Sequence, residues 1–197
     1  MKTEVTELRT EAVYSDDGEK RYLLRKTWDA TKPKLAIVML AAGGADGIQL
    51  DTTTQLVINN SSRLGYGSVA ILNLSATLND FNLRYGDDDE ENVKTIVEAA
   101  KEAEKVVYAP GTGKAKNTTF VRLQEQVIRA LQPYESKLCC LCNEEGEGRL
   151  QHPLSPQVRR WNISPLKVKE LITVPVEPET KPKKKPKEKE QKKETGE

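Results

Sequence analysis

The sequence of 197 residues has one histidine and three cysteines, and 5% of its residues are aromatic. One histidine is too few for a zinc site built on imidazoles. The cysteines at 139, 140 and 142 lack ligand spacing, because neighbouring residues of a strand point to opposite faces. We therefore expect no metal site, and no motif calls for a cofactor. The apolar run around the cysteines instead predicts unpaired buried thiols, which are typical of a cytosolic protein.

Long hydrophobic runs are also missing. No apolar stretch reaches the length of about 18 residues that a membrane-spanning helix needs. Residues 1–10 (MKTEVTELRT) have no apolar core of the kind found in signal peptides. We expect a cytoplasmic protein without a membrane partner. A net charge of +1 gives no global electrostatic reason for binding nucleic acid, and the oligomeric state stays open.

The end of the chain is rich in charge and poor in apolar residues. Residues 181–197 read KPKKKPKEKEQKKETGE, which buries too little surface to offset the entropy of ordering the chain. We predict a disordered Lys/Pro/Glu-rich tail over 175–197. It is either a polybasic arm for phosphate backbones or a solvating appendage, and the interspersed glutamates favour the appendage.

The body of the chain begins with a predicted β-hairpin over 5–28. Asp17-Gly18 separates two alternating segments, which is a strong hairpin signal. Strict alternation along the second strand would put Tyr22, Leu24 and Lys26 on one face.

Strands then alternate with helices over a predicted core at 34–161. Strands are expected at 35–42, 68–74, 106–109 and 137–142, and helices at 52–64, 87–103 and 120–131. This order predicts one α/β domain over 1–174, with a three-layer arrangement and a mostly parallel central sheet. A short C-terminal helix is expected over 165–172.

The first core strand ends in a glycine loop that carries two acids. Ligands of open α/β sheets bind at the carboxyl ends of the strands, so Gly43 and Gly44 are candidate binding residues. Asp46 and Asp51 are candidates for a base, a water holder or a ligand for ribose hydroxyls. The structural alternatives are a turn at Asp46 and a helix N-cap at Asp51.

Other loops at the same edge supply further candidates. Residues 108–114 (YAPGTGK) resemble a phosphate-binding loop but lack its first glycine and its final hydroxyl. Gly113 and Lys114 are left as weak candidates for contacting a phosphate. Asn73 ends a buried strand and needs partners from the backbone or a ligand. His152 is a candidate electrophile or a turn residue, and Arg149 is a candidate phosphate ligand or a solvated side chain.

These residues together resemble a family of bacterial and phage proteins known only as a domain of unknown function. The corresponding segments are 21–29 (RYLLRKTWD), 38–40 (VML), 45–46 (AD), 51–53 (DTT), 65–67 (GYG), 73–74 (NL) and 152–154 (HPL). The resemblance covers about 21–161 and implies a protein of phage or mobile-element origin.

That family is in turn distantly similar to the uracil-DNA glycosylase superfamily. The similarity implies an α/β/α layout, a water-positioning loop after the first core strand, and a late His-Pro-Ser loop that 152–156 (HPLSP) resembles. Carried over, His152 would stabilise charge on a departing base, Ser155 would belong to the loop that contacts DNA, and Asn73 would read a base edge.

The chain departs from the pattern of the domain-of-unknown-function family at 41–44. Ala-Ala-Gly-Gly stands where the family has Asn-Pro-Ser-Thr, and alanine neither orients a water nor accepts its proton. We therefore expect a nucleotide- or nucleic-acid-base-binding protein of glycosylase-like type. The alternatives are an active DNA glycosylase that uses Asp46 or Asp51 with His152, and an interaction module that sequesters a host factor.

Overall fold

The computed structural model describes residues 1–86, 89–114 and 116–172. The tail predicted over 175–197 lies outside the described residues. Within them, no helix is long and apolar enough to cross a membrane. In chain order the elements are β1 (Arg9–Tyr14), β2 (Arg21–Thr27), β3 (Lys34–Ala42), α1 (Thr52–Arg63), β4 (Ser68–Leu78), α2 (Glu90–Glu102), β5 (Lys105–Tyr108), α3 (Thr118–Leu131), a 3-10 helix (Gln132–Lys137), β6 (Leu138–Cys142), β7 (Gly148–Arg149), a second 3-10 helix (Pro156–Val158), β8 (Asn162–Pro165) and α4 (Lys169–Ile172).

The described strands form one mixed sheet in the order β1-β2-β4-β3-β5-β6-β7, with β8 also paired to β6. The predicted hairpin is confirmed as β1 and β2, and its turn is closed by a hydrogen bond from the Gly18 N–H to the Ser15 carbonyl. Gly18 has a φ of 74° there, which glycine adopts without steric cost.

The expectation of a mostly parallel sheet is wrong. Among the described strands, β4–β3, β3–β5 and β5–β6 are parallel, whereas β1–β2, β2–β4, β6–β7 and β6–β8 are antiparallel. Parallel pairing occurs where helices connect successive strands, because a parallel crossover needs a long connection. Short links join β1 to β2 and β6 to β7, which pair antiparallel, and the pairs β2–β4 and β6–β8 are antiparallel as well, so only the centre of the sheet is parallel.

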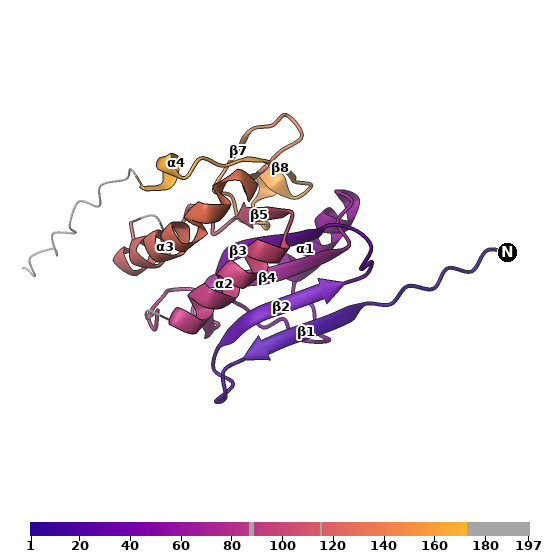
Figure 1. Cartoon of the computed structure of the whole chain (residues 1–197), viewed down its shortest axis with the longest axis horizontal. Helices are drawn as coiled ribbons and strands as arrows, with labels where there is room; N and C mark the ends of the chain where they lie inside the picture. The colour runs from indigo at the N-terminus through magenta and orange to yellow at the C-terminus, as the bar shows by residue number, and fades with distance from the viewer. Residues whose placement is uncertain (87–88, 115, 173–197) are drawn as a thin grey trace, which may run out of the picture.

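Helices cover both faces of the sheet, as the three-layer expectation requires. α2 and α3 lie side by side over one face, and α1 lies on the other (Figure 1). Each of these helices begins at a polar side chain that accepts a backbone N–H of the first turn, which stabilises helix starts. The capping residues are Asp51, Asp89 and Asn117, so the predicted cap at Asp51 is confirmed.

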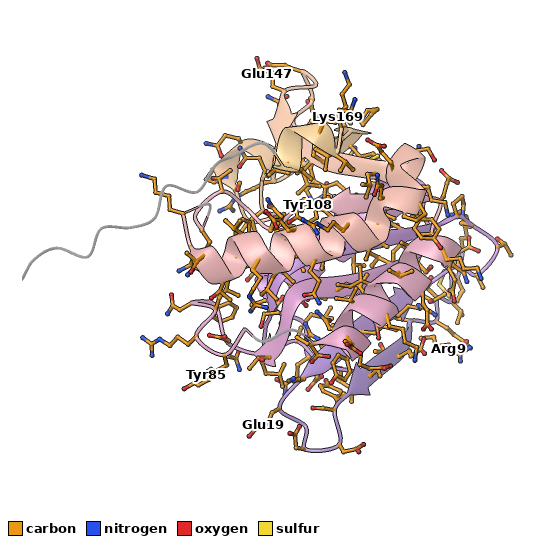
Figure 2. The ribbon with its side chains drawn as sticks, turned by 60° about the vertical axis from the view of Figure 1, so that its left-hand side comes forward. Arg9, Glu19, Tyr85, Tyr108, Glu147 and Lys169 are labelled. Atoms are coloured by element: carbon orange, nitrogen blue, oxygen red, sulfur yellow. The ribbon has the colours of Figure 1, made fainter. Side chains whose placement is uncertain are left out.

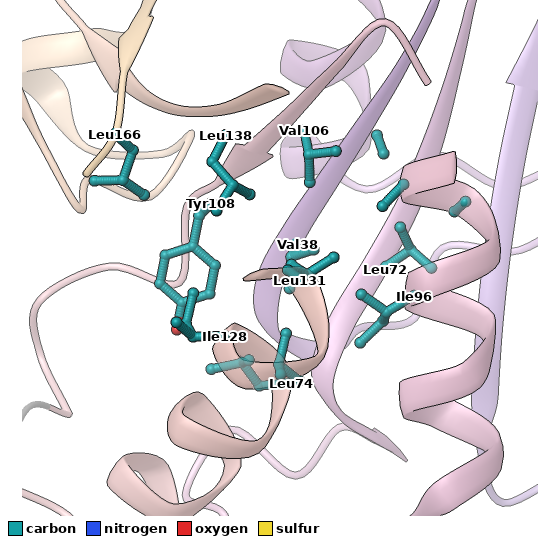
Figure 3. Close-up of a cluster of buried hydrophobic side chains, with 14 of the residues drawn as sticks. Val38, Leu72, Leu74, Ile96, Val106, Tyr108, Ile128, Leu131, Leu138 and Leu166 are labelled. Carbon is teal, nitrogen blue, oxygen red and sulfur yellow. The ribbon is translucent and has the colours of Figure 1, made fainter. Parts of the chain in front are cut away.

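The apolar side chains form two cores, one on each side of the sheet. The larger core lies under α2 and α3 and includes Val38, Leu72, Ile96 and Leu131 (Figure 3). Tyr108 belongs to the same core and lies in the interior of the molecule (Figure 2). Its hydroxyl donates to the Gln124 side-chain oxygen at 3.1 Å, and burial raises its pKa.

The C-terminal part differs from expectation. The helix predicted over 165–172 is reduced to α4, and residues 162–165 form strand β8 against β6. Trp161, which is fully buried in the core under α1, precedes this strand. Burial of this large side chain fixes the segment on the sheet, where its backbone completes the ladder of β6.

Gly67 joins two segments that the sequence separates. Its carbonyl accepts the N–H groups of Trp28 and Asp29, at 2.9 and 3.0 Å, and its own N–H donates to the carbonyl of Pro33. A Cβ at this position would lie 1.9 Å from the Asp29 carbonyl oxygen. The position therefore requires glycine for close approach of the two backbones.

We predict that Gly67→Ala lowers the free energy of unfolding by about 3 kcal/mol, because backbone on both sides must move to accommodate the methyl group. Urea unfolding followed by circular dichroism measures this change. At Gly47 an added Cβ meets nothing within 4 Å, so Gly47→Ala is the control and should change stability by less than about 1 kcal/mol. Equal losses in the two variants would contradict the steric explanation.

Candidate functional site

A cavity of about 440 Å³ opens at the carboxyl end of β3, where ligands of α/β sheets bind. We call it the β3 pocket. Its walls come from the end of β3, the first turn of α1, strands β2 and β4, and three loops. The lining residues are Arg21, Met39, Leu40, Ala41, Gly43, Gly44, Asp51, Thr52, Thr53, Thr54, Ile71, Phe81, His152 and Leu154. Four of the residues expected at a site, Gly43, Gly44, Asp51 and His152, therefore lie together.

His152 enters the pocket from a tight turn of four residues. Its carbonyl accepts the Ser155 N–H at 2.8 Å, and its own N–H donates to the Ser155 hydroxyl at 3.3 Å. The ring Nδ1 accepts the Leu154 N–H at 3.2 Å, so a neutral ring carries its proton on Nε2. Ser155 thus closes the turn and does not line the pocket.

Burial lowers the pKa of His152 below 6.5, and the Asp51 carboxylate opposes this shift. The neutral imidazole is therefore the form favoured at neutral pH. Gly111 packs against the same turn, since a Cβ there would lie 3.2 Å from the His152 Cβ. The loop after β5 therefore packs against the turn that carries His152.

Asp51 has a structural role and also faces the pocket. One carboxylate oxygen accepts the Thr54 N–H at 2.7 Å and caps α1. The other lies 3.0 Å from the place that a Cβ of Gly43 would occupy. Glycine at 43 thus leaves room for the carboxylate to lie against the loop backbone.

Asp46 does not line the pocket. Its Oδ1 accepts the N–H groups of Ile48 and Gln49, each at 2.7 Å, and these two bonds lower its pKa. Asp46 therefore has the structural role in a turn that the sequence offered as the alternative to a catalytic one. Its carboxylate accepts hydrogen bonds from the backbone of its own loop.

Two buried cations of β2 hold the loop between β3 and α1, and sequence reasoning missed both. An Nη atom of Arg21 donates to the carbonyls of Gly43 and Ala45. Lys26 Nζ donates to the carbonyls of Asp46 and Gly47, at 3.1 and 2.9 Å. Arg21 is 3% exposed and Lys26 is 1% exposed, and burial lowers the pKa of both.

A β-bulge explains why Arg21 reaches this loop. The ladder pairs Val13 with Leu23 and then Tyr14 with Arg21, so Tyr22 has no partner across the strand. An extra residue reverses the alternation of side chains, which puts Arg21, rather than Tyr22, on the side of Lys26. No local pattern in the sequence predicts the bulge.

Asn73 does not itself line the pocket but neighbours two residues that do. It follows Ile71 on the same face of β4 and lies opposite Met39 in the β3–β4 ladder, and both of these residues line the pocket. Asn73 is 1% exposed. Its Oδ1 and Nδ2 have no hydrogen-bond partner among the described residues.

The remaining candidates lie elsewhere. Lys114 Nζ donates to the Asn82 side-chain oxygen at 3.0 Å, and Gly113 faces open space. The backbone of Arg149 pairs with Leu141 in β7, but its side chain is outside the described part of the structure. Across residues 1–86, 89–114 and 116–172, no three His, Cys, Asp or Glu side chains gather where they could hold a metal ion.

A family model matches residues 21–154, which is more than half of the chain, and its description is "Protein of unknown function (DUF1643)". The chain belongs to this family. The matched segment begins at Arg21 and ends at Leu154, so it includes both the cation that holds the glycine loop and the turn that carries His152. Comparisons with curated proteins and with solved structures gave no match.

Because the chain has one histidine, NMR resolves its titration without ambiguity. We predict a midpoint below 6.5 for the ring of His152, and a still lower midpoint in Asp51→Asn, where the carboxylate that favours the imidazolium is gone. Asparagine still caps the helix. Since the folded-state pKa is lowered, the stability contributed by the neutral ring is present above pH 6.5 and lost as the pH falls through the folded-state value.

Asp46→Asn is the matched control, because Asp46 is not among the groups that shift the pKa of His152. It should leave the midpoint unchanged. A wild-type midpoint at or above 6.5, or the same shift in both variants, would be incompatible with this geometry.

Proposed function

We propose that the β3 pocket binds the base of a nucleotide or of a nucleic acid. The observation that carries the proposal is the side chain of Asn73. A buried amide with neither its oxygen nor its nitrogen hydrogen-bonded is rare in proteins, because each unpaired group costs about 1–3 kcal/mol. A ligand that offers one donor and one acceptor side by side would satisfy both atoms. The edge of a nucleobase has this arrangement.

The other walls of the pocket suit the same ligand. Phe81 is 53% exposed at the pocket lining, and an aromatic side chain at such a place is able to stack on a planar base. The neutral ring of His152 presents Nε2–H as a donor for a carbonyl oxygen. A volume of about 440 Å³ lies within the usual range for small-ligand sites.

The similarity to the uracil-DNA glycosylase superfamily supports a base as the ligand, since the loop that contains His152 resembles the late loop of those enzymes. The pocket also contains Ala41, Gly43 and Gly44, where the pattern of the domain-of-unknown-function family has polar residues. The loss of polar groups there favours binding over hydrolysis.

We predict that Asn73→Leu raises the free energy of unfolding by about 1–3 kcal/mol, because it replaces two unpaired polar atoms by apolar groups of similar shape. The same substitution should abolish binding of nucleosides and nucleotides. Isothermal titration calorimetry with each common nucleoside monophosphate, together with urea unfolding, measures both effects.

Ser61→Ala is the control, since the Ser61 hydroxyl is also buried without a partner in the described structure but does not line the pocket. It should raise stability without changing affinity. If Asn73→Leu were destabilising and still bound nucleotides, the proposal would fail.

A second candidate function is hydrolysis of an N-glycosidic bond, and the shared pocket of Asp51 and His152 favours it. A water beside the free oxygen of Asp51 could transfer a proton to that carboxylate as its oxygen attacks the sugar carbon. The bond to the base would break with its electron pair on the base, where His152 Nε2–H would stabilise the charge. Asp46 is excluded from this role by its position outside the pocket.

For this candidate, incubation with oligonucleotides that carry modified bases should generate abasic sites. Asp51→Asn should slow the reaction by about 10²–10⁴-fold, as expected for loss of a general base, while Asp46→Asn should retain the wild-type rate. Equal rates in Asp51→Asn and wild type, or no abasic product on any substrate, would rule out hydrolysis and leave binding.

A further inference from the structure

A second cavity lies next to the β3 pocket, on the other side of one loop. It has a volume of about 890 Å³ and is lined by Glu19 and Lys20 of the hairpin and by residues of 77–85. We call it the β4 pocket. The loop over 79–86 contributes Phe81 to the β3 pocket and Tyr85 to the β4 pocket. One short segment therefore forms a wall of both cavities.

This loop carries the two most exposed aromatic side chains of the described residues. Phe81 is 53% exposed and Tyr85 is 71% exposed, and the next is Tyr14 at 38%. Tyr85 lies at the outer edge of the molecule (Figure 2). Aromatic side chains that stand out from the surface in this way serve as stacking platforms for bases of single-stranded nucleic acids.

The loop is held in a defined conformation. Asp80 is 6% exposed, and its two carboxylate oxygens accept the N–H groups of Arg84 and Tyr85, at 2.9 and 2.8 Å. Asn79 and Leu83 have φ values of 60° and 55°; asparagine adopts this region readily, but leucine does so only when the surroundings impose it. These bonds thus hold the backbone of the loop that carries the two aromatic residues.

The loop itself carries a cation that is available to an anionic chain, whereas Lys20 of the lining is paired with Asp89, the middle one of five acids in the sequence 87–91. Arg84 is exposed, and its guanidinium has no hydrogen bond or ion pair among the described residues. Lys114 reaches the loop by its bond to the neutral side chain of Asn82. The lining of the β4 pocket contains two acids, Asp80 and Glu19. The carboxylate of Asp80 already accepts two backbone N–H groups, so Glu19 is the remaining acid that would repel an anionic ligand.

We propose that the β4 pocket holds the nucleotide adjacent to the one whose base occupies the β3 pocket, so that the ligand is a single-stranded polynucleotide segment. This inference rests on the proposed function. Phe81 contacts the base in the first pocket, Tyr85 stacks on its neighbour, and Arg84 pairs with the phosphate backbone at the rim.

The test compares ligands of different length on the full chain. Affinities for thymidine monophosphate and for oligothymidylates of two, four and six nucleotides are measured by calorimetry and fluorescence anisotropy, and the series is repeated with oligouridylates and oligoadenylates. We expect the oligonucleotides to bind about tenfold or more tightly than the mononucleotide. Tyr85→Ala should remove this gain and leave mononucleotide affinity unchanged.

Two further variants separate stacking from charge and from general effects. Arg84→Gln should reduce the magnitude of the slope of log affinity against log salt by about one, as expected for the loss of one phosphate contact. Tyr14→Ala removes a partly exposed tyrosine on β1 and should change neither the affinity nor the slope.

The outcomes distinguish the two proposals. If mononucleotides bind and oligonucleotides bind no tighter, or if Tyr85→Ala and Tyr14→Ala behave alike, the second subsite is overturned and the proposed function stands. If oligonucleotide binding depends on Tyr85 but not on Asn73, the β3 pocket is not the base site, and the adjacent-nucleotide arrangement is overturned with it. If no nucleotide or oligonucleotide binds, both proposals are overturned.

Discussion

The candidate site depends on two buried cations that bind backbone carbonyls. Arg21 and Lys26 reach the loop between β3 and α1 from the neighbouring strand β2 and donate to four of its carbonyl oxygens. Neither has an ion pair with a carboxylate in the described structure, so the carbonyl dipoles replace much of the lost hydration. Removing either partner from such an arrangement would leave a charge or a carbonyl buried and unpaired. The loop is consequently held against β2 at Gly43, Ala45, Asp46 and Gly47.

Once this loop is fixed, the remaining geometry of the pocket follows. Gly43 lies close to the free oxygen of Asp51, and Asp51 in turn caps α1. The carboxylate of Asp51 also acts on His152 across the cavity. The pocket therefore combines a buried cation, a carboxylate and a neutral imidazole, and beside two of its lining residues lies the amide of Asn73, which has no hydrogen-bond partner among the described residues. This set of groups is the basis for the proposal that a base, a neutral planar ligand with polar edges, occupies the pocket.

Several features of the fold could be predicted from local sequence. Asp17-Gly18 predicts the hairpin, the apolar runs predict the core strands, and Asp51 predicts the start of α1, because each depends on neighbours in the chain. The balance of parallel and antiparallel pairing could not be predicted in this way. It depends on where the segment after β6 folds back, and burial of Trp161 decides that through contacts with residues distant in the sequence.

For the site, the sequence by itself determined the edge of the sheet and a set of polar residues at strand ends, including Gly43, Asp51 and His152. Only the tertiary structure decided which of them share a cavity. Asp46 and Asp51 are equivalent candidates in sequence, but hydrogen bonds to its own loop occupy Asp46, whereas Asp51 faces the pocket. Arg21 reaches the pocket because an unpaired residue reverses the alternation of β2. Such a bulge arises from the way in which two strands pair, so the residue pattern of β2 by itself does not predict it.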